Sequence, residues 1–592
     1  MLAEPSAETP LLGQDTVNNG LASQRTEERI RRRNHRLAGF LIAALMVAGM
    51  ITLGLRTGRH SHQPKHESEP PRMQWKPCYE NGLLCSSLRV PLDYKSATGE
   101  SMSIALIRLP GSATNSSASP IFLNPGGPGA SGIEFIRNLG TKLGKLLHGK
   151  YDLISFDPRG VGQSNAISCF ETAAQHAYFD AQHQMLPTSA RTNDHESIAA
   201  RVARDSVLAF SCRKKAGHIL PYVSTAAAAR DLDLLRAAMD QELLNYWGFS
   251  YGTLLGSTYA NMFPDKVGKM VLDGVADPEA WIGPSVELKP VSDDSLVDTE
   301  AVLDGFGSLC ETAGPDQCAL ASVVRGPSHP VADTLRKFLE ELKLTPLVVY
   351  DGETPGILSQ SMAAESLFMS LYKPRTWQKV ASAFNDAITY ANGTKLYYMS
   401  VSSGPTDFCS TGGDSEDYSN LAVHCTDRRP FTDLKHMLSQ VQRLAEMSPL
   451  AGAMWGWWAS PCLSWNVTAA ERYTGPWNAT TRNKLLLIGN AYDPVTPFRH
   501  AKRLSNLMSD SSVLLRHNGY GHCSIAQAST CTMDAIRTYF AHGADAVHAR
   551  ECGVDEDLFP APSSLGTMIH PQTRLIADVA TGIRGPRLRR KN

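Results

Sequence analysis

The chain has 592 residues, with 57 Lys and Arg against 58 Asp and Glu, so its formal net charge is −1. This balance excludes a general nucleic-acid binder, which needs a basic face, and an acidic tail protein. Apolar residues make up 42% of the chain and charged residues 19%, which is enough apolar material for a large core and excludes a wholly disordered chain.

An uncharged apolar stretch, Leu37–Leu55, lies between Arg36 and Arg56. A helix of this length nearly spans a hydrocarbon core of roughly 30 Å. The arginines that precede the stretch predict a signal-anchor with a cytosolic N-terminus, and hence a type II membrane protein. A cleaved signal peptide is the main alternative, but the stretch is longer than the apolar region of such a peptide and no A-x-A site follows it.

All twelve cysteines follow this stretch, which indicates a lumenal or extracellular location for the rest of the chain. Four N-x-S/T sequons, candidates for glycosylation, also follow it: Asn115, Asn392, Asn466 and Asn478. Short intervals predict local disulfides between Cys78 and Cys85 and between Cys310 and Cys318. Spacing does not settle the other pairings.

The segments on either side of the apolar stretch are polar. Residues 1–36 lack apolar periodicity and predict a disordered cytosolic tail. Residues 56–75 are predicted to form a stalk. The three histidines in it, His60, His62 and His66, do not indicate a metal site, because no Cys or carboxylate is placed to complete a rigid ligand shell.

Short apolar runs that end in turn residues recur along the rest of the chain and are separated by helical stretches. They cover residues 119–125, 151–157, 245–250, 269–274, 484–490 and 512–518. This pattern predicts buried parallel strands, so the fold class is α/β, a mostly parallel sheet flanked by helices.

A long interval interrupts the strand series, and its helical texture predicts an inserted cap. The expected organisation is a tail at 1–36, a transmembrane span at 37–55, a stalk at 56–75, core at 76–277, cap at 278–477, core at 478–555 and a C-terminal tail at 556–592.

The motif Gly248-Phe249-Ser250-Tyr251-Gly252 follows a predicted strand and opens a predicted helix. A serine on a sharp strand-to-helix turn, with small neighbours that let the backbone pack, is typical of a nucleophile elbow. The motif therefore predicts Ser250 as a catalytic nucleophile.

A serine nucleophile needs a base, and the base needs an orienting acid. Asp493 and His522 follow the last two predicted strands, so the order Ser, Asp, His fits this architecture. Asp273 is the competing acid, and His517 is the competing base. We favour Asp493 and His522, because Gly519 and Gly521 form a loop able to project the later histidine.

The segment Asn124-Pro125-Gly126-Gly127-Pro128-Gly129 follows a predicted strand and predicts an oxyanion hole. We assign its backbone N–H donors to Gly127 and Tyr251. The segment is not a phosphate loop, because no Lys-Ser/Thr pair follows its glycines. The expected chemistry needs no metal or other cofactor.

Four motifs in this order resemble the prolyl- and tripeptidyl-aminopeptidase branch of the α/β-hydrolases: N-P-G-G-P-G-A-S-G, Y-D-L-I-S-F-D-P-R-G-V-G-Q-S, W-G-F-S-Y-G-T-L-L-G and I-G-N-A-Y-D-P-V-T-P. The resemblance covers roughly residues 75–555 and implies an α/β-hydrolase fold and a serine exopeptidase with the triad Ser250, Asp493 and His522. Prolyl-specific members have His where this chain has Pro125, which favours the tripeptidyl type. The membrane anchor also differs from the usual soluble or secreted members.

An aminopeptidase must also bind a free ammonium group, which requires a carboxylate partner. Glu134, Glu365 and Asp427 are candidates, and the pattern does not choose among them. An esterase or amide hydrolase acting on small molecules with the same triad is the alternative function, and a non-catalytic binding ectodomain is disfavoured because all three triad residues are present.

Overall fold

The computed structural model describes residues 73–96, 99–112, 120–183, 194–283, 293–323, 330–351, 355–400, 418–561 and 573–575. The predicted tail, the predicted span Leu37–Leu55 and the stalk up to residue 72 lie outside these residues, as do Asn115 and Cys409. No helix within the described ranges is both long enough and apolar enough to cross a membrane.

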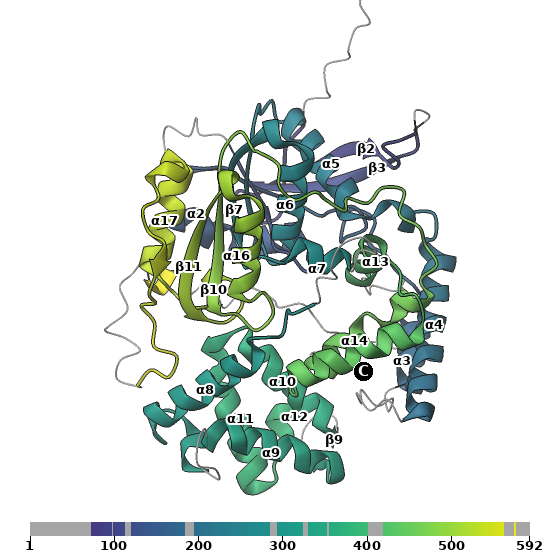
Figure 1. Cartoon of the computed structure of the whole chain (residues 1–592), viewed down its shortest axis with the longest axis vertical. Coiled ribbons are helices and arrows are strands. Elements are labelled where there is room, and N and C mark those ends of the chain that lie inside the picture. The colour runs from purple at the N-terminus through teal and green to yellow at the C-terminus, as the bar shows by residue number, and fades with distance from the viewer. Residues whose placement is uncertain are drawn as a thin grey trace, which may run out of the picture. The chain divides into compact units, whose positions relative to one another are not determined.

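One sheet runs through the core (Figure 1). Its strands within the described residues follow the order β1-β2-β3-β5-β4-β6-β7-β10-β11-β12. The bounds are β1 Lys76–Pro77, β2 Leu84–Pro91, β3 Ser101–Leu109, β4 Ile121–Asn124, β5 Leu153–Phe156, β6 Leu244–Phe249, β7 Val267–Asp273, β10 Leu485–Tyr492, β11 Ser512–Tyr520 and β12 Glu551–Cys552. From β5 to β12 all neighbours pair in parallel. The six strands expected from the sequence are therefore confirmed.

The antiparallel edge formed by β1, β2 and β3 was not expected from the sequence. Along β2 and β3, buried and exposed residues alternate in part, so neither strand reads as a continuous apolar run. One-sided burial of this kind is typical of antiparallel edge strands.

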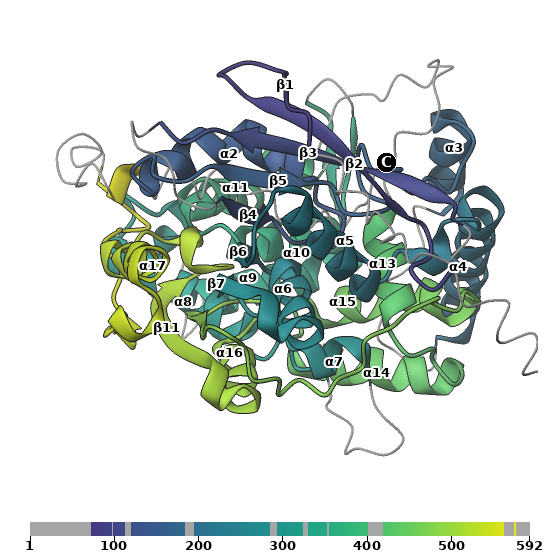
Figure 2. The same ribbon diagram turned by 90° about the horizontal axis from the view of Figure 1, so that it is seen from above.

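Helices cover both faces of the sheet, as Figure 2 shows from above. Helices α2 (Gly132–Leu146) and α17 (Thr530–His542) pack on one face, and α5 (Thr225–Ala238), α6 (Tyr251–Met262) and α16 (Phe498–Leu507) on the other. Each face of the sheet therefore has its own apolar core, the first under α2 and α17 and the second under α5, α6 and α16. Successive side chains of a strand point to opposite faces, so on β6 Trp247 belongs to the first core and Tyr246 to the second.

Strands β7 and β10 are neighbours in the sheet, yet residues 274–484 lie between them in the chain. This β7–β10 excursion is mostly helical and contains α7 Pro278–Ile282, α8 Thr299–Ala313, α9 Pro330–Leu344, α10 Gln360–Leu371, α11 Trp377–Tyr390, α12 Thr394–Ser400, α13 Ser419–Asp427, α14 Leu434–Met447 and α15 Gly452–Trp458, with the hairpin β8 Leu347–Val349 and β9 Gly356–Leu358. Helices α8 to α12 gather around their own apolar core, while α13, α14 and α15 contribute to the sheet's second core, beside α3 (Ala173–His183) and α4 (His195–Ala216) (Figure 1).

The described cysteines form the disulfides Cys78–Cys85, Cys169–Cys212, Cys310–Cys318, Cys425–Cys462 and Cys531–Cys552. The two predicted local bridges are among them. Cys523 has a free, buried thiol. The sequon residues Asn392, Asn466 and Asn478 are exposed. Disulfides of this number are typical of a lumenal or extracellular protein.

Candidate active site

Ser250 occupies the turn between β6, which ends at Phe249, and α6, which begins at Tyr251. Its backbone has φ 56° and ψ −125°, a conformation that residues with a side chain rarely adopt. The Ser250 N–H donates to the Asp273 carbonyl oxygen at 3.0 Å, which ties the turn to the end of β7. This strained turn projects the serine side chain from the carboxyl end of the sheet.

Glycines around Ser250 are required by close backbone contacts. A Cβ on Gly248 would lie 2.4 Å from the Gly252 carbonyl oxygen, and one on Gly252 would lie 2.6 Å from the Asn124 carbonyl oxygen. A Cβ on Gly126 would lie 2.4 Å from the Phe249 carbonyl oxygen. The turn and the glycine-rich loop after β4 are therefore packed backbone to backbone, which only glycine permits.

Asp493 and His522 meet beyond the ends of β10 and β11. His522 Nδ1 lies 3.0 Å from Asp493 Oδ2, and the Asp493 side chain is fully buried. The same carboxylate accepts hydrogen bonds from the N–H groups of Val495, Thr496 and Cys523 at 2.8–3.0 Å. Burial alone would raise the pKa of Asp493, but His522 and these donors hold it below its usual range.

Thr496 completes this arrangement, and sequence reasoning did not single it out. Its hydroxyl donates to Asp493 Oδ2 at 2.9 Å and lies 3.1 Å from His522 Nδ1. The Tyr372 ring packs edge-on against the imidazole, with centroids 5.2 Å apart. Contacts on both sides of the ring fix its orientation, and an ionised acid on Nδ1 leaves Nε2 as the atom able to accept a proton.

Ser250 and His522 line the same pocket. His522 Nε2 is buried and has no hydrogen-bond partner among the described residues. The structure thus brings the three predicted triad residues to one place, with the acid on one nitrogen of the imidazole and the serine in the pocket that the ring lines.

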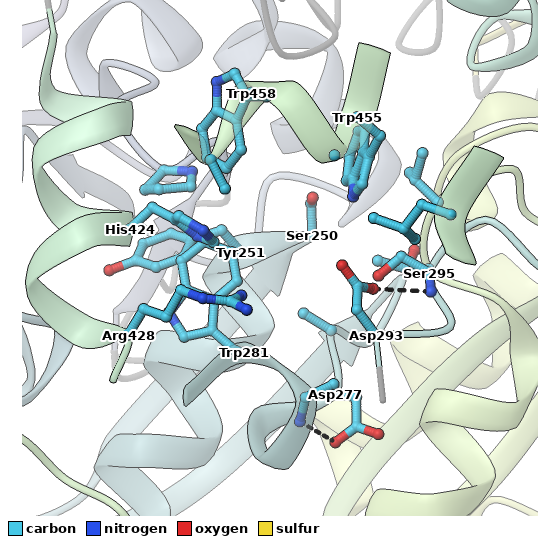
Figure 3. A pocket seen from close by; sticks show the side chains of 18 of the residues that line it. Ser250, Tyr251, Asp277, Trp281, Asp293, Ser295, His424, Arg428, Trp455 and Trp458 are labelled. Atoms are coloured by element: carbon cyan, nitrogen blue, oxygen red, sulfur yellow. Dashed lines mark hydrogen bonds between the residues drawn. The ribbon is translucent and has the colours of Figure 1, made fainter. Parts of the chain in front are cut away.

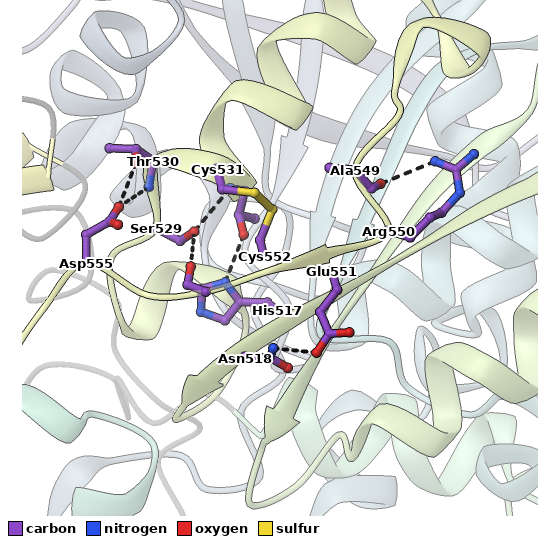
Figure 4. Close-up of a disulfide and its surroundings, with 12 residues drawn as sticks. His517, Asn518, Ser529, Thr530, Cys531, Ala549, Arg550, Glu551, Cys552 and Asp555 are labelled. Carbon is purple, nitrogen blue, oxygen red and sulfur yellow. Dashed lines mark hydrogen bonds between the residues drawn. A yellow bond between two sulfur atoms is a disulfide. The ribbon is translucent and has the colours of Figure 1, made fainter.

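The two competing residues have other hydrogen-bond partners, although Asp273 is close enough to feel the charges of Asp493 and His522. Asp273 is fully buried and accepts hydrogen bonds from the Ser524 N–H at 2.8 Å and the Ser524 hydroxyl at 2.6 Å, and burial raises its pKa to about 6. His517 lies inside β11, where its Nδ1 is 2.9 Å from the Thr532 hydroxyl, near the Cys531–Cys552 disulfide (Figure 4). Burial lowers the pKa of His517 to about 4, so this ring is a neutral core residue.

The predicted oxyanion-hole residues Gly127 and Tyr251 both line the pocket beside Ser250. Gly127 has φ 108°, in the region that favours glycine. The Tyr251 side chain is buried, and its hydroxyl is 2.6 Å from the Thr225 hydroxyl. This contact holds the side chain of the residue whose backbone N–H directly follows Ser250 in the chain.

The pocket walls are aromatic with a few charged groups (Figure 3). The tryptophans come from the β7–β10 excursion: Trp281 from α7, and Trp455 and Trp458 from α15. Asp293 and Arg428 also come from this excursion and line the pocket. The excursion therefore supplies most of the surface that a substrate bound at Ser250 would touch.

The carboxylates proposed from the sequence for an ammonium group are not on this surface. Glu134 is exposed on α2 and pairs with Arg137. Asp427 is buried and accepts hydrogen bonds from Thr225 and Trp281, and burial raises its pKa to about 6.

Glu365 lies on α10, partly exposed, and does not line the pocket. Asp293, which sequence reasoning missed, does line it, and its side chain accepts a hydrogen bond from the Ser295 N–H at 3.0 Å. No local motif marks this residue, because only the folded excursion brings it towards Ser250.

One group of side chains has the ligand atoms of a cation site. Oxygen or nitrogen atoms of Asp277, Asp294 and His500 lie within 4.8 Å of one another. His500 Nε2 is 2.6 Å from Asp294 Oδ1, and Arg503 forms ion pairs with both carboxylates. The guanidinium already supplies the positive charge that these acids need, so the group is a salt-bridge network at the pocket edge.

Two family profiles match the chain. One, described as "alpha/beta hydrolase fold", matches residues 119–306, which include Ser250. The other, described as "TAP-like protein", matches residues 448–552, which include Asp493 and His522. The profiles thus lie on either side of the middle of the β7–β10 excursion.

Three curated relatives are similar over most of their lengths. Serine protease Hip1 from Mycobacterium tuberculosis (strain ATCC 25618 / H37Rv) is 28% identical over 547 residues, covering 87% of this chain and 96% of the relative. Tripeptidyl aminopeptidase from Streptomyces lividans is 25% identical over 540 residues, covering 86% and 94%. Carboxylesterase B from the same Mycobacterium tuberculosis strain is 27% identical over 495 residues, covering 80% and 88%.

Proposed function

Because the chain belongs to the α/β-hydrolases, in the branch that contains serine peptidases and tripeptidyl aminopeptidases, we propose that it is a serine exopeptidase that releases short peptides or single residues from free N-termini. The chain is a serine hydrolase. The observation that carries the proposal is the buried Asp493–His522 contact beside a pocket that also exposes Ser250.

The proposed reaction follows from this geometry. Ser250 Oγ attacks the scissile carbonyl carbon while His522 Nε2 takes the hydroxyl proton, and Asp493 stabilises the resulting imidazolium. The N–H groups of Gly127 and Tyr251 bind the oxyanion, and such a donor typically contributes about 3–4 kcal/mol. The protonated imidazole then gives its proton to the departing amine, and water hydrolyses the acyl-enzyme by the same route in reverse.

We assign the substrate ammonium group to Asp293. A buried ammonium needs a carboxylate partner, and Asp293 is a pocket-lining acid that forms no ion pair with another described residue. Asp277 also lines the pocket, but Arg503 already neutralises it. The tryptophans that surround this space favour the apolar parts of a short peptide.

We propose further that Leu37–Leu55 anchors the protein in a membrane as a type II signal-anchor, with the catalytic part on the lumenal or extracellular side. The disulfides on the described part support that side. In this arrangement the predicted cap, residues 278–477, covers the pocket and selects the substrate.

A second candidate is an esterase or amide hydrolase acting on small molecules. The relative named Carboxylesterase B favours it, because the same triad attacks esters and amides alike. The two candidates differ in their need for a free amine.

Labelling and turnover test these proposals. A fluorophosphonate probe is expected to label the wild-type chain and not Ser250→Ala, and labelling of that variant would refute the nucleophile. On a panel of peptide amides and short esters, peptides with a free N-terminus are expected to be cleaved faster than their N-acetylated forms. Faster cleavage of blocked peptides or esters would favour the second candidate.

A pair of carboxylate variants tests the ammonium partner. Asp293→Asn is expected to reduce kcat/KM for free peptides about 10- to 100-fold and to leave the rate on N-blocked esters much less affected. Glu134→Gln, an exposed carboxylate away from the pocket, is the matched control. An equal loss on free and blocked substrates would refute the role of Asp293.

A further inference from the structure

One wall of the pocket carries two polar side chains that the proposed reaction does not use. Helix α13 and its C-cap residue bring His424 and Arg428 to this wall, one helical turn apart. In Figure 3 they lie on one side of Ser250, with Asp293 on the other. The pocket therefore has a cationic wall and an anionic wall.

Arg428 is a buried cation with little compensation. Its side chain is 6% exposed, one guanidinium nitrogen donates to Gln440 Oε1 at 2.5 Å, and the guanidinium lies 4.8 Å from the centre of the Phe431 ring. No carboxylate among the described residues forms an ion pair with it, and the negative charge of Asp293 acts on it only across the pocket, so burial still lowers the pKa of Arg428. A buried guanidinium held directly by a neutral amide and an aromatic face retains unused donors.

His424 is also buried, and its ring nitrogens lack hydrogen-bond partners among the described residues. Its ring centroid lies 4.7 Å from that of Trp281 and 4.6 Å from that of Trp458. Burial and the nearby Arg428 lower the pKa of His424 well below its usual range, so the ring is neutral. A neutral imidazole carries one N–H donor, and burying that donor unsatisfied costs free energy.

The surroundings hold these groups in place. Trp281 Nε1 donates to Asp427 Oδ2 at 3.0 Å, and Asp427 in turn accepts from the Thr225 N–H at 2.7 Å. On the other side, Gln440 Nε2 lies 3.0 Å from His436 Nε2, which orients its carbonyl oxygen towards the guanidinium. The wall is therefore built before any ligand arrives, as a binding site requires.

We propose that His424 and Arg428 form a subsite for a carboxylate group of the substrate, an inference that rests on the proposed peptidase function. A carboxylate offers two oxygens to the guanidinium and to the imidazole N–H, in the charge-assisted geometry that arginine favours. A cation would be repelled by Arg428, and an apolar group would leave both side chains unpartnered. Together with Asp293, the subsite orients a substrate that carries an ammonium and a carboxylate.

Matched peptide pairs test the subsite and identify the source of the carboxylate. In one arm a short peptide ends in a free carboxylate or a carboxamide, and in the other the residue before the scissile bond is Glu or Gln. Wild-type kcat/KM is expected to favour the carboxylate member of one arm, and Arg428→Gln is expected to reduce that preference about 10- to 100-fold. His424→Phe keeps a ring between the tryptophans and is expected to reduce it by a smaller factor.

Both members of a pair are measured on one preparation, so their ratio does not depend on how much of a variant folds. Arg443→Gln removes a neighbouring positive charge that does not line the pocket, and it is expected to keep the wild-type ratio. An unchanged ratio in Arg428→Gln, or an equal loss in Arg443→Gln, would overturn the subsite.

A binding measurement separates failure of the subsite from failure of the proposed function. If the wild-type chain hydrolyses none of the peptides, the peptidase proposal fails. Calorimetry with Ser250→Ala then decides the subsite: tighter binding of a tripeptide acid than of its amide supports it, and equal binding of the two overturns it.

Discussion

Replacing Asp493 by Asn probes the acid of the proposed triad while preserving the shape of the side chain. Each carboxylate oxygen accepts at least one backbone N–H: Oδ1 from Val495 and Thr496, and Oδ2 from Cys523. An amide placed there in either orientation therefore turns an NH₂ group towards a backbone donor. We expect a loss of folding free energy of about 1–3 kcal/mol for the unsatisfied contact.

The catalytic loss should be larger than the loss of stability. An amide NH₂ facing His522 Nδ1 requires the tautomer with its proton on Nε2, which is the nitrogen that must accept the Ser250 proton. We expect kcat to fall about 10⁴-fold, which corresponds to about 5 kcal/mol of transition-state stabilisation. The assay is steady-state hydrolysis of a chromogenic ester or peptide substrate by the folded variant.

Asp273→Asn is the matched control, because Asp273 is equally buried and lies at the end of the neighbouring strand β7. Its side chain contacts Ser524, so we expect reduced stability with at most a modest loss of kcat. A larger loss of kcat in Asp273→Asn than in Asp493→Asn would refute the assignment of the acid.

Three further predictions concern the support of the site. Thr496→Val removes the hydroxyl that contacts both Asp493 and His522, and we expect kcat to fall about 10-fold with little change in KM; a change in KM alone would contradict a positioning role. Gly126→Ala introduces a Cβ 2.4 Å from the Phe249 carbonyl oxygen. Fluorophosphonate labelling of this variant should be lost although its circular dichroism spectrum remains that of the folded protein, and normal labelling would show that the loop can move away. The pKa of Asp427 is raised from 3.8 to about 6 in the folded protein, so the unfolded chain releases its proton first and stability falls as pH rises through this window, by about 3 kcal/mol. Urea unfolding of wild type and Asp427→Asn at several pH values checks this. Because Asp273 also has a pKa raised to about 6 and keeps its own contribution, the variant should lose about 3 kcal/mol less than wild type over this window, and parallel curves would contradict the prediction.

The central strands and the turn at Ser250 were predictable because local rules determine them. Buried parallel strands read as continuous apolar runs, and the glycines at 248 and 252 stand where a Cβ would strike backbone atoms. The β2 and β3 strands escaped prediction because part of each faces solvent, so their apolar residues are interrupted.

The pocket walls could not be predicted because they depend on long-range contacts. Asp293, His424 and Arg428 stand in segments without a recognisable motif and reach the pocket only through the fold of the β7–β10 excursion. The sequence could not choose among Glu134, Glu365 and Asp427 for the same reason, since it does not show which carboxylates the protein has already paired. The bridges Cys169–Cys212 and Cys425–Cys462 likewise join residues that spacing alone does not relate.

The insertion of residues 274–484 between two neighbouring strands has a consequence for biosynthesis. A ribosome that has reached residue 484 has completed Ser250, its turn and the tryptophan-lined wall, but neither Asp493 nor His522. The proposed nucleophile therefore has no base until the last strands are made and β10 pairs with β7. During translation, the nascent chain therefore cannot use this triad on its neighbours before its own fold is complete.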